Sequence, residues 1–249
     1  MAGSSSFPQA GNGSCPPGVF GSIGVAATGN TPGGNFGGQA WTDNNGNLWL
    51  FSGSQCDSTG HDGSMNDLWM YSPTSTEWTW VAGPDVNSAV DHYVGVYGTL
   101  KQASASNTPG DRLQGATWTD TTGRFWLFGG EGPDSVTAVP LPLNDLWMFD
   151  PTSKEWTWEG GPDTVIVTGY TAGNPGVYAA QGSLNANNQP GSRYEAATWT
   201  DANGNLWMFG GEGVDSTGTA GLSLNDLWMY SISSGEWNWV CLLYTSRCV

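Results

Sequence analysis

Asn66-Asp67-Leu68-Trp69 is one of three copies of the same tetrapeptide in this 249-residue chain; the others are Asn144–Trp147 and Asn225–Trp228. A second signature, Trp-Thr-Asp, begins at Trp41 and also occurs three times. Both series advance by about 80 residues, and all 15 tryptophans fall into the scheme, five in each repeat. A fixed period over most of the chain is typical of a protein built from repeated structural units.

Each repeat contains four short segments with the composition of β-strands. They are rich in aromatic residues and bounded by residues that favour turns. Turn-forming residues at 120–123 and 150–154 join the first and the last pair tightly, and apolar residues at helical spacing are missing. In the second repeat we expect the strands at Gly115–Thr119, Arg124–Phe128, Asp145–Phe149 and Glu155–Trp158.

The second strand of a repeat is apolar on both faces, as Leu206-Trp207-Met208-Phe209 illustrates. A sheet with one face in water would alternate apolar and polar residues. A four-stranded sheet held between two similar sheets would not, and radial stacking of such sheets gives a β-propeller. The sequence therefore predicts an all-β fold of stacked four-stranded blades.

Four features of the repeat together resemble the kelch family. They are the Gly129-Gly130 pair after the second strand, the Asn-Asp-Leu-Trp that opens the third strand, the aromatic-Asp-Pro turn at 149–151, and a tryptophan in the fourth strand. An arginine before the first strand, Arg112 or Arg193, also fits the kelch pattern.

The first repeat departs from this pattern, because Asn35 takes the place of the arginine and Ser52-Gly53 that of the diglycine. The resemblance covers nearly all of residues 18–240. It implies a kelch-type β-propeller, similar to bacterial kelch repeats and to the central domain of galactose oxidase. It does not imply an activity, because propellers carry many functions.

The repeat predicts three blades, whereas radial closure usually takes four to eight. Met1 aligns with a residue just after a fourth strand, so we expect an open fragment of a six- or seven-bladed propeller. The last nine residues match nothing in the repeat. The expected organisation is a loop from a missing upstream blade (1–34), blade 1 (35–80), a loop (81–111), blade 2 (112–158), a loop (159–192), blade 3 (193–240) and a foreign or artefactual tail (241–249).

The charge balance excludes some partner classes. Six Lys and Arg residues stand against 22 Asp and Glu residues, which gives a formal net charge of −16. Nucleic-acid binding requires a cationic surface, so we do not expect that partner. No apolar stretch is long enough to cross a membrane as a helix, so we do not expect membrane insertion either.

The long connections between strands suggest where a ligand binds. The connections from a fourth strand to the next first strand and from a second to a third strand share one face of a propeller, and both are long here. We call this the long-loop face. Its recurring carboxylates are the candidate ligand-binding residues: Asp57, Glu131, Asp134, Glu212 and Asp215.

Two other interpretations of these carboxylates remain open. They could hold calcium through oxygen ligands, although the dense Asp-x-Asp-x-Asp spacing of a calcium loop is absent. Each aspartate could also cap its own turn by accepting hydrogen bonds from nearby backbone amides, which is the interpretation we favour. We therefore expect no cofactor other than calcium.

Cys15 and Cys56 both fall on the long-loop face. A disulfide between them would fit an oxidising compartment, and hence an extracellular, cell-surface or periplasmic protein. Two buried or free thiols are the alternative. The histidines, His61 and His92, do not recur, and no catalytic triad or copper-ligand spacing is legible around them.

We therefore expect a non-catalytic module that binds a protein or a glycan on its long-loop face. The first alternative is the propeller part of a carbohydrate-active or galactose-oxidase-like enzyme whose active site lies in missing blades. The second is a structural surface or adhesion array. An open arc should also leave aromatic faces bare, around Trp49 and Phe51 in one end blade and Trp207 and Phe209 in the other, so we expect self-association through them.

Overall fold

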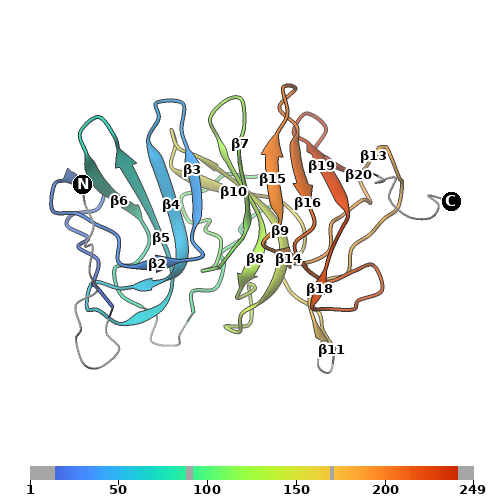
Figure 1. The fold of residues 1–249 in the computed structure, drawn as a ribbon, viewed down its shortest axis with the longest axis horizontal. Coiled ribbons are helices and arrows are strands. Elements are labelled where there is room, and N and C mark those ends of the chain that lie inside the picture. Colours follow the sequence, from blue (N-terminus) through green and yellow to red (C-terminus); the bar gives the residue numbers. More distant parts are fainter. Residues whose placement is uncertain (1–14, 88–91, 169–170, 241–249) are drawn as a thin grey trace.

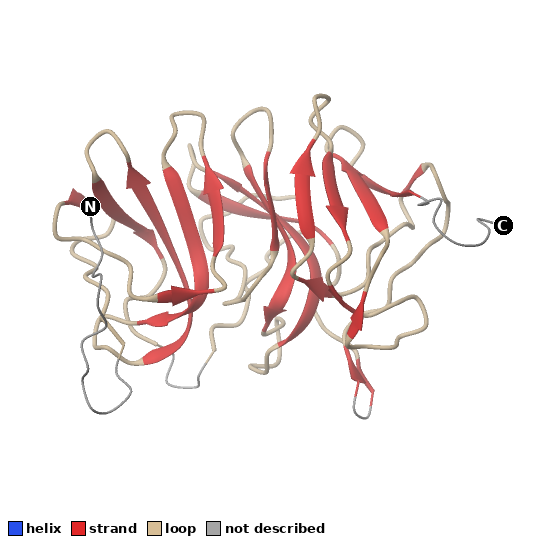
Figure 2. Ribbon diagram, viewed as in Figure 1, coloured by secondary structure: helices blue, strands red, loops and turns tan. Residues whose placement is uncertain are grey.

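The computed structural model describes residues 15–87, 92–168 and 171–240, and over these residues the chain is built of strands and loops without a helix (Figures 1 and 2). No helix in this part of the chain is therefore available to cross a membrane. Residues 1–14 of the expected first loop and the expected tail, 241–249, lie outside the described residues.

Three antiparallel sheets form the body of the molecule, one for each repeat, and each has four main strands. Sheet 1 contains β3 (Gln39–Thr42), β4 (Leu48–Cys56), β5 (Asp62–Ser72) and β6 (Glu77–Ala82). Sheet 2 contains β7 (Ala116–Thr119), β8 (Phe125–Gly132), β9 (Leu141–Asp150) and β10 (Glu155–Gly160). Sheet 3 contains β15 (Ala197–Thr200), β16 (Leu206–Phe209), β19 (Leu227–Ser231) and β20 (Glu236–Val240).

The first strands of the three sheets, β3, β7 and β15, lie next to one another, and the sheets stand side by side behind them (Figure 1). We call the side of these strands the inner side of the molecule. The all-β fold and its antiparallel four-stranded units confirm the prediction from the repeat. The remaining short strands are β1 (Ala26–Ala27), β2 (Asn35–Phe36), β11 (Val167–Thr168), β12 (Thr171–Ala172), β13 (Leu184–Asn185), β14 (Arg193–Tyr194), β17 (Glu212–Gly213) and β18 (Leu222–Ser223).

In sheets 1 and 2 the second and third strands extend further than the sequence predicts. In sheet 2 the hairpin continues past the diglycine, so that Gly132 of β8 pairs with Leu141 of β9. The register shifts between Phe128 and Gly130, where Gly129 and Gly130 take φ values of 61° and 98°. A diglycine adopts such angles without a steric penalty. It therefore forms a bulge inside the hairpin, where the sequence alone suggested a strand end.

The long connections wrap around the outer edge of each sheet instead of only covering the long-loop face. β1 pairs with the fourth strand of sheet 1, and β13 pairs with that of sheet 3. A buried asparagine fixes each connection: the amide of Asn107, for example, donates to Gln102 O at 2.9 Å and to Trp156 O at 3.1 Å. Asn30 and Asn188 make the same two kinds of bond. These long connections therefore pack against the fourth strands of the sheets.

Tryptophans of the third strands form the centre of each sheet's core. Trp69, Trp147 and Trp228 are each 0% exposed, and each indole N–H donates to the aspartate two residues earlier at 2.6–2.7 Å. The hydrogen bond satisfies the one polar atom of a large apolar side chain, so the indole can be buried completely. The Asn-Asp-Leu-Trp tetrapeptide is therefore a structural unit of the core.

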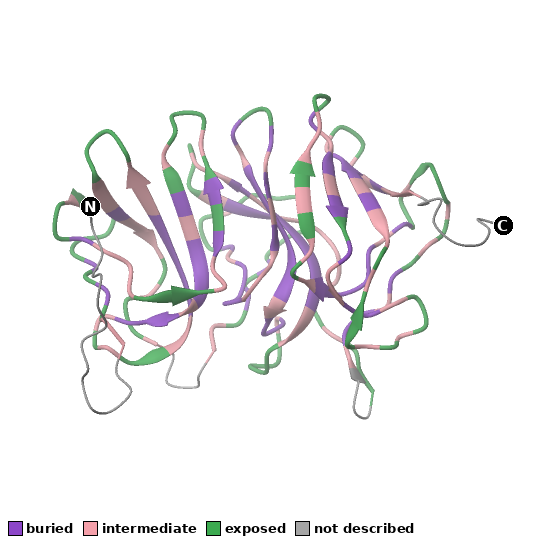
Figure 3. Ribbon diagram, viewed as in Figure 1, coloured by how far each residue is buried: buried purple, intermediate pink, exposed green. Residues whose placement is uncertain are grey.

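Adjacent sheets are joined by aromatic contacts and by indole hydrogen bonds. The Trp41 and Trp118 indoles donate to carbonyl oxygens of the next sheet, at Trp126 and Trp207. Trp199 holds the equivalent position in sheet 3 and is 45% exposed (Figure 3 shows the burial along the chain).

The prediction of a bare aromatic face around Trp49 and Phe51 in sheet 1 was wrong, because these residues are only 4% and 1% exposed. They pack between sheets 1 and 2, against Phe125 and Trp156. In sheet 3 the two residues expected on a bare face are more accessible: Phe209 is exposed and Trp207 is half-buried. Periodicity alone does not say which apolar side of a strand faces a neighbour.

Repeats 2 and 3 each bury a bidentate ion pair. Arg112 donates to both carboxylate oxygens of Asp145, at 2.8 and 3.0 Å, and the arginine is 0% exposed. Arg193 and Asp226 form the same pair at 2.6 and 2.8 Å. This pairing explains why the arginine and the aspartate of the tetrapeptide occur together.

Repeat 1 replaces this ion pair with amides. Asn35 stands in the arginine position, and the amide of Gln55 donates to Asp67 instead. Gln55 aligns with Gly132 of repeat 2, where an added Cβ would clash with the carbonyl oxygen of Asp111 and with Arg112. With no guanidinium in repeat 1, the Gln55 amide is the group that meets the buried Asp67 carboxylate.

Candidate functional site

The aspartates predicted as ligand-binding residues are engaged with their own loops. The carboxylate of Asp134 accepts hydrogen bonds from the backbone N–H groups of Val136, Thr137 and Val165 at 2.6–2.9 Å. The residue is only 3% exposed. Asp215 accepts from Thr217 and Thr219 and is half-buried. These contacts are those of turn caps.

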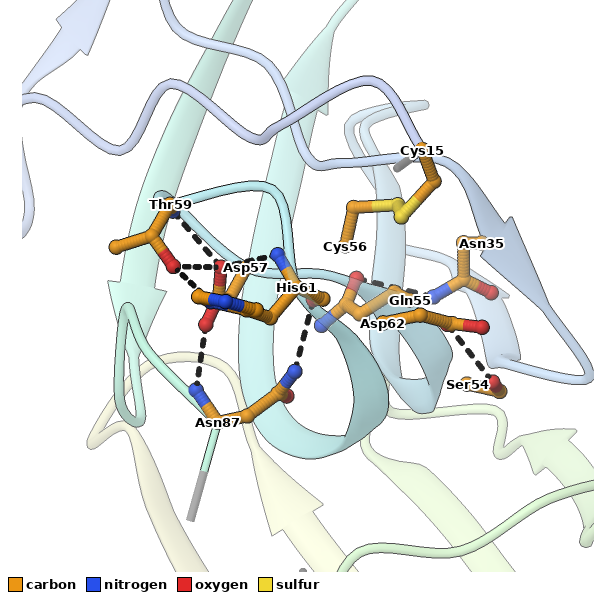
Figure 4. The surroundings of a disulfide bond; sticks show 10 residues. All are labelled: Cys15, Asn35, Ser54, Gln55, Cys56, Asp57, Thr59, His61, Asp62 and Asn87. Carbon is orange, nitrogen blue, oxygen red and sulfur yellow. Dashed lines mark hydrogen bonds between the residues drawn. A yellow bond between two sulfur atoms is a disulfide. The ribbon is translucent and has the colours of Figure 1, made fainter. Parts of the chain in front are cut away.

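Asp57 caps the equivalent turn of repeat 1 (Figure 4). Its carboxylate accepts from Thr59, His61 and the more distant Asn87, at 2.7–3.0 Å. Burial acts to raise the pKa of Asp57, but these hydrogen bonds outweigh it and lower the pKa to about 2. The ionised carboxylate thus fastens the loop after Cys56 to the following connection.

Cys15 and Cys56 are joined as a disulfide beside this turn (Figure 4). Their Cα atoms are 5.9 Å apart, within the separation that a disulfide requires. The bond ties the connection entering sheet 1 to the end of β4. Among the described residues no cysteine is free.

A second group of side chains lies where the long-loop face meets the inner side. Each repeat contributes a residue with positive φ just before its first strand: Gly37, Gln114 and Glu195, at 70°, 56° and 57°. They are linked across the sheets, because Gln114 N donates to Gly37 O at 2.8 Å and Glu195 N donates to Gln114 O at 2.9 Å. This backbone ladder fixes the spacing of the side chains around it.

The two predicted glutamates belong to this group. Glu131 pairs with Leu113 in an isolated bridge, and Glu212 pairs with Tyr194 between β17 and β14. In repeat 1 the equivalent pair is Ser54 with Phe36. We call the group formed around the ladder the inner rim; it consists of Phe36, Leu113, Gln114, Glu131, Tyr194, Glu195 and Glu212.

The hydrogen-bond donors of the inner rim already face carboxylates. The Gln114 amide donates to Glu195 at 2.5 Å. Burial, a hydrogen bond with Glu212 and the charges of Glu212, Glu131 and Glu195 raise the pKa of Tyr194 to about 12. Three carboxylates therefore lie close to one tyrosine, with no Lys or Arg among the residues of the rim. The surface offers acceptors and apolar contact, notably from Phe36, which is 65% exposed.

The sequence pointed to Glu131 and Glu212 but missed the other residues of the rim. These other residues do not form a recurring motif. The dipeptide after Asn35, Arg112 or Arg193 differs in each repeat: it is Phe36-Gly37, Leu113-Gln114 or Tyr194-Glu195. Aligning that position across the repeats would have found them.

Each histidine contacts one polar neighbour. His61 contacts the Thr59 hydroxyl at 2.7 Å, and His92 contacts the buried carboxylate of Asp111 at 3.0 Å. Within residues 15–87, 92–168 and 171–240, no group of three or more His, Cys, Asp or Glu side chains is arranged to hold a metal ion.

No family model matches the chain. Among curated proteins it is similar to the flagellar outer arm dynein alpha chain of Chlamydomonas reinhardtii, with 36% identity over 70 residues. This region is 27% of the chain but only 1% of the dynein, so it says nothing of a shared role.

Two solved structures are similar to the chain. YjhT, a kelch-type β-propeller, superposes with a TM-score of 0.52 at 14% identity, over 89% of this chain and 56% of that chain. A fungal alcohol oxidase of the AA5 family, in complex with copper, gives a TM-score of only 0.41 at 14% identity, over 87% and 32% of the two chains. The chain thus spans little more than half of YjhT. The first likeness supports a kelch-like propeller fold, and at this identity it extends to the fold alone.

Proposed function

We propose that this protein is a non-catalytic binding module whose inner rim recognises a basic segment of a protein partner. The observation that carries the proposal is the placement of Glu131, Glu195 and Glu212 on the inner rim. Glu212 pairs with Tyr194, Glu195 follows Tyr194 in the connection after β14 and accepts from Gln114, and Glu131 pairs with Leu113. The donors of the rim are already turned toward these carboxylates, so the charge that a ligand meets is negative. A partner with lysine or arginine side chains supplies the cationic hydrogen-bond donors that the rim lacks.

The remainder of the chain supports this assignment. A net charge of −16 attracts a cationic partner over a distance and raises its association rate. The Tyr194 ring, beside Glu212, offers a face on which a guanidinium group can stack. A glycan would instead need exposed donors as well as acceptors, which the rim lacks. The disulfide fits an extracellular, cell-surface or periplasmic location, which we propose as well.

The test is binding of a fluorescent nonapeptide rich in arginine, followed by anisotropy. Replacing Glu131 and Glu212 with glutamine is expected to weaken binding by about tenfold, because each exposed charge contact contributes up to about 1 kcal/mol. Binding should also weaken as salt is raised from 50 to 300 mM.

The matched control replaces Glu77 and Glu155 with glutamine. It changes the net charge by the same amount at the opposite end of the sheets, where these residues begin β6 and β10. Equal losses in both variants would mean that the peptide senses only overall charge, and the proposed site would then be wrong. Tighter binding of a neutral oligosaccharide than of the peptide would favour a glycan ligand.

We also propose that the three sheets are three consecutive blades of a larger propeller. Support comes from the indole bonds of Trp41 and Trp118, each of which reaches the next sheet, whereas the equivalent Trp199 and the nearby Phe209 are 45% and 37% exposed. A further blade would cover both rings in the same way.

In the isolated chain this surface should drive association, since burying apolar area stabilises contacts by roughly 25 cal/mol per Å². Light scattering at micromolar concentration is expected to show species larger than a monomer. Replacing Trp199 with aspartate should shift the distribution toward monomer. A wild-type protein that is monodisperse and monomeric would contradict the exposed end blade.

A further inference from the structure

A cleft between sheets 2 and 3 contains polar groups that the proposed function does not use. It opens beside β10 and is lined on the other side by β19, β20 and the connection before sheet 3. Its empty volume is about 470 Å³ when the open solvent at its mouth is included. The lining residues that matter here are Glu159, Gly160, Gln189, Tyr230 and Glu236.

Three of these side chains are without hydrogen bonds to other described residues. The Nε2 atom of Gln189 is buried and unpartnered. Neither the Glu159 carboxylate nor the Tyr230 hydroxyl has a hydrogen bond within the described part of the chain, although Glu159 is half-buried and Tyr230 is 3% exposed. Burial raises the pKa of Glu159, against the opposing charges of Lys101 and Arg124. An unsatisfied buried polar atom such as Gln189 Nε2 is uncommon and calls for an explanation.

The junction between sheets 1 and 2 shows that the fold does not need these groups. The equivalents of Glu159 and Gly160 there are Val81 and Ala82, which pack against the apolar core. The equivalent of Tyr230 is Phe149, a buried core residue. The equivalent of Gln189 is Thr108, whose hydroxyl is satisfied locally by Pro109 O at 3.0 Å. Three positions therefore change together, from apolar or satisfied to polar and without a hydrogen bond in the described chain, and at the fourth Gly160 has no side chain.

Gly160 is not required by its own backbone. An added Cβ would meet no atom within 4 Å, and its φ is not in the positive range. The same local bulge in sheet 1 accepts Ala82. Glycine within a strand weakens it relative to a residue with a side chain. Because Gly160 has no side chain, the cleft stays open at this position.

From this arrangement we propose that the cleft between sheets 2 and 3 binds a monosaccharide-sized polyhydroxy ligand. The unpartnered groups include an acceptor, the Glu159 carboxylate; a donor, the Gln189 amide; and a phenol that can do either. Neighbouring hydroxyl groups on a sugar ring both donate and accept, so one ligand satisfies all three. An organic cation would satisfy the carboxylate but leave the amide donor without a partner. This site is separate from the inner rim.

The test uses saturation-transfer NMR with free D-glucose, D-galactose, D-mannose and N-acetylglucosamine, and with L-arginine as the cationic probe. We expect at least one sugar to bind with a Kd on the order of 1 mM, as suits a shallow site with few polar contacts. A Glu159→Val, Gly160→Ala, Gln189→Thr and Tyr230→Phe variant copies the first junction. It should weaken binding at least tenfold while its Tm stays equal or rises.

Several results would contradict the proposed sugar site. Unchanged sugar binding in the four-residue variant, no binding of any of the four sugars, or stronger binding of L-arginine would each overturn the proposal. A clear fall in Tm would show that the polar groups hold the junction together, and would overturn it as well. The Glu131→Gln, Glu212→Gln variant should bind the sugar normally, so failure at the inner rim and failure at the cleft are distinguishable.

Discussion

Replacing Asp145 with asparagine is expected to lower the free energy of unfolding by about 3–5 kcal/mol, because it leaves a buried charge without its partner. Arg112 is 0% exposed and donates two hydrogen bonds to this carboxylate, which also accepts from Tyr97 and Trp147. Asparagine cannot neutralise the guanidinium. Urea unfolding followed by tryptophan fluorescence measures the loss.

The same substitution at Asp67 should act in the opposite direction at neutral pH. Asp67 is the equivalent aspartate of repeat 1, and it is 1% exposed with no arginine beside it. Phe20 takes the place of Tyr97, so the phenol donor is lost too. Burial raises the pKa of Asp67 to about 6, although hydrogen bonds from Trp69 and Gln55 oppose the shift. Asparagine avoids burying the negative charge and keeps an oxygen for the Trp69 indole.

The pH dependence of this effect follows from linkage. The folded chain binds a proton at Asp67 more tightly than the unfolded chain does, so this group stabilises the fold below about pH 4 and loses that contribution as pH rises through about 6. Asp67→Asn should therefore gain about 2–3 kcal/mol over the wild type at pH 7.5 compared with pH 4. A gap between wild type and variant that does not change with pH would show that Asp67 is not a buried, unpaired acid.

Loss of the Cys15–Cys56 disulfide is expected to lower the free energy of unfolding by about 3–4 kcal/mol. The bond closes a loop with a sequence separation of 41, and a disulfide of this span restricts the unfolded chain strongly. Cys15→Ser is the better substitution, because Cys56 is 1% exposed and a serine there would bury a hydroxyl as well. Thermal unfolding with and without dithiothreitol measures the effect.

Cys241 and Cys248 should be replaced by serine in every protein of that comparison, so that the result concerns one bond only. In this background dithiothreitol is expected to lower the Tm of the Cys15–Cys56 protein and to leave Cys15→Ser unchanged. Equal melting of the two proteins under oxidising conditions would mean that the bond does not form, and it would remove the support for an oxidising compartment.

Local sequence was sufficient for the parts of the fold that depend on neighbours in the chain. The turn at 120–123 follows from Asp120, whose carboxylate accepts the backbone N–H groups of Thr122 and Arg124 at 2.8 and 3.1 Å and the Trp126 indole at 3.0 Å. Such contacts span a few residues, and the residue types that make them recur in every repeat. The four main strands of each repeat, their antiparallel pairing and the turns between them could be predicted for this reason.

The packing between repeats could not be obtained in this way. The sequence of β4 is apolar on both faces, and only the neighbouring sheet shows that Trp49 and Phe51 are covered. Gln55 contacts Asp67 because an arginine is absent twenty residues earlier, at Asn35. The inner rim and the cleft each join side chains that lie far apart in the sequence, such as Gln114 with Glu195 and Glu159 with Tyr230. A repeat specifies its own strands, but the groups that two repeats place opposite each other depend on how their sheets twist and stack.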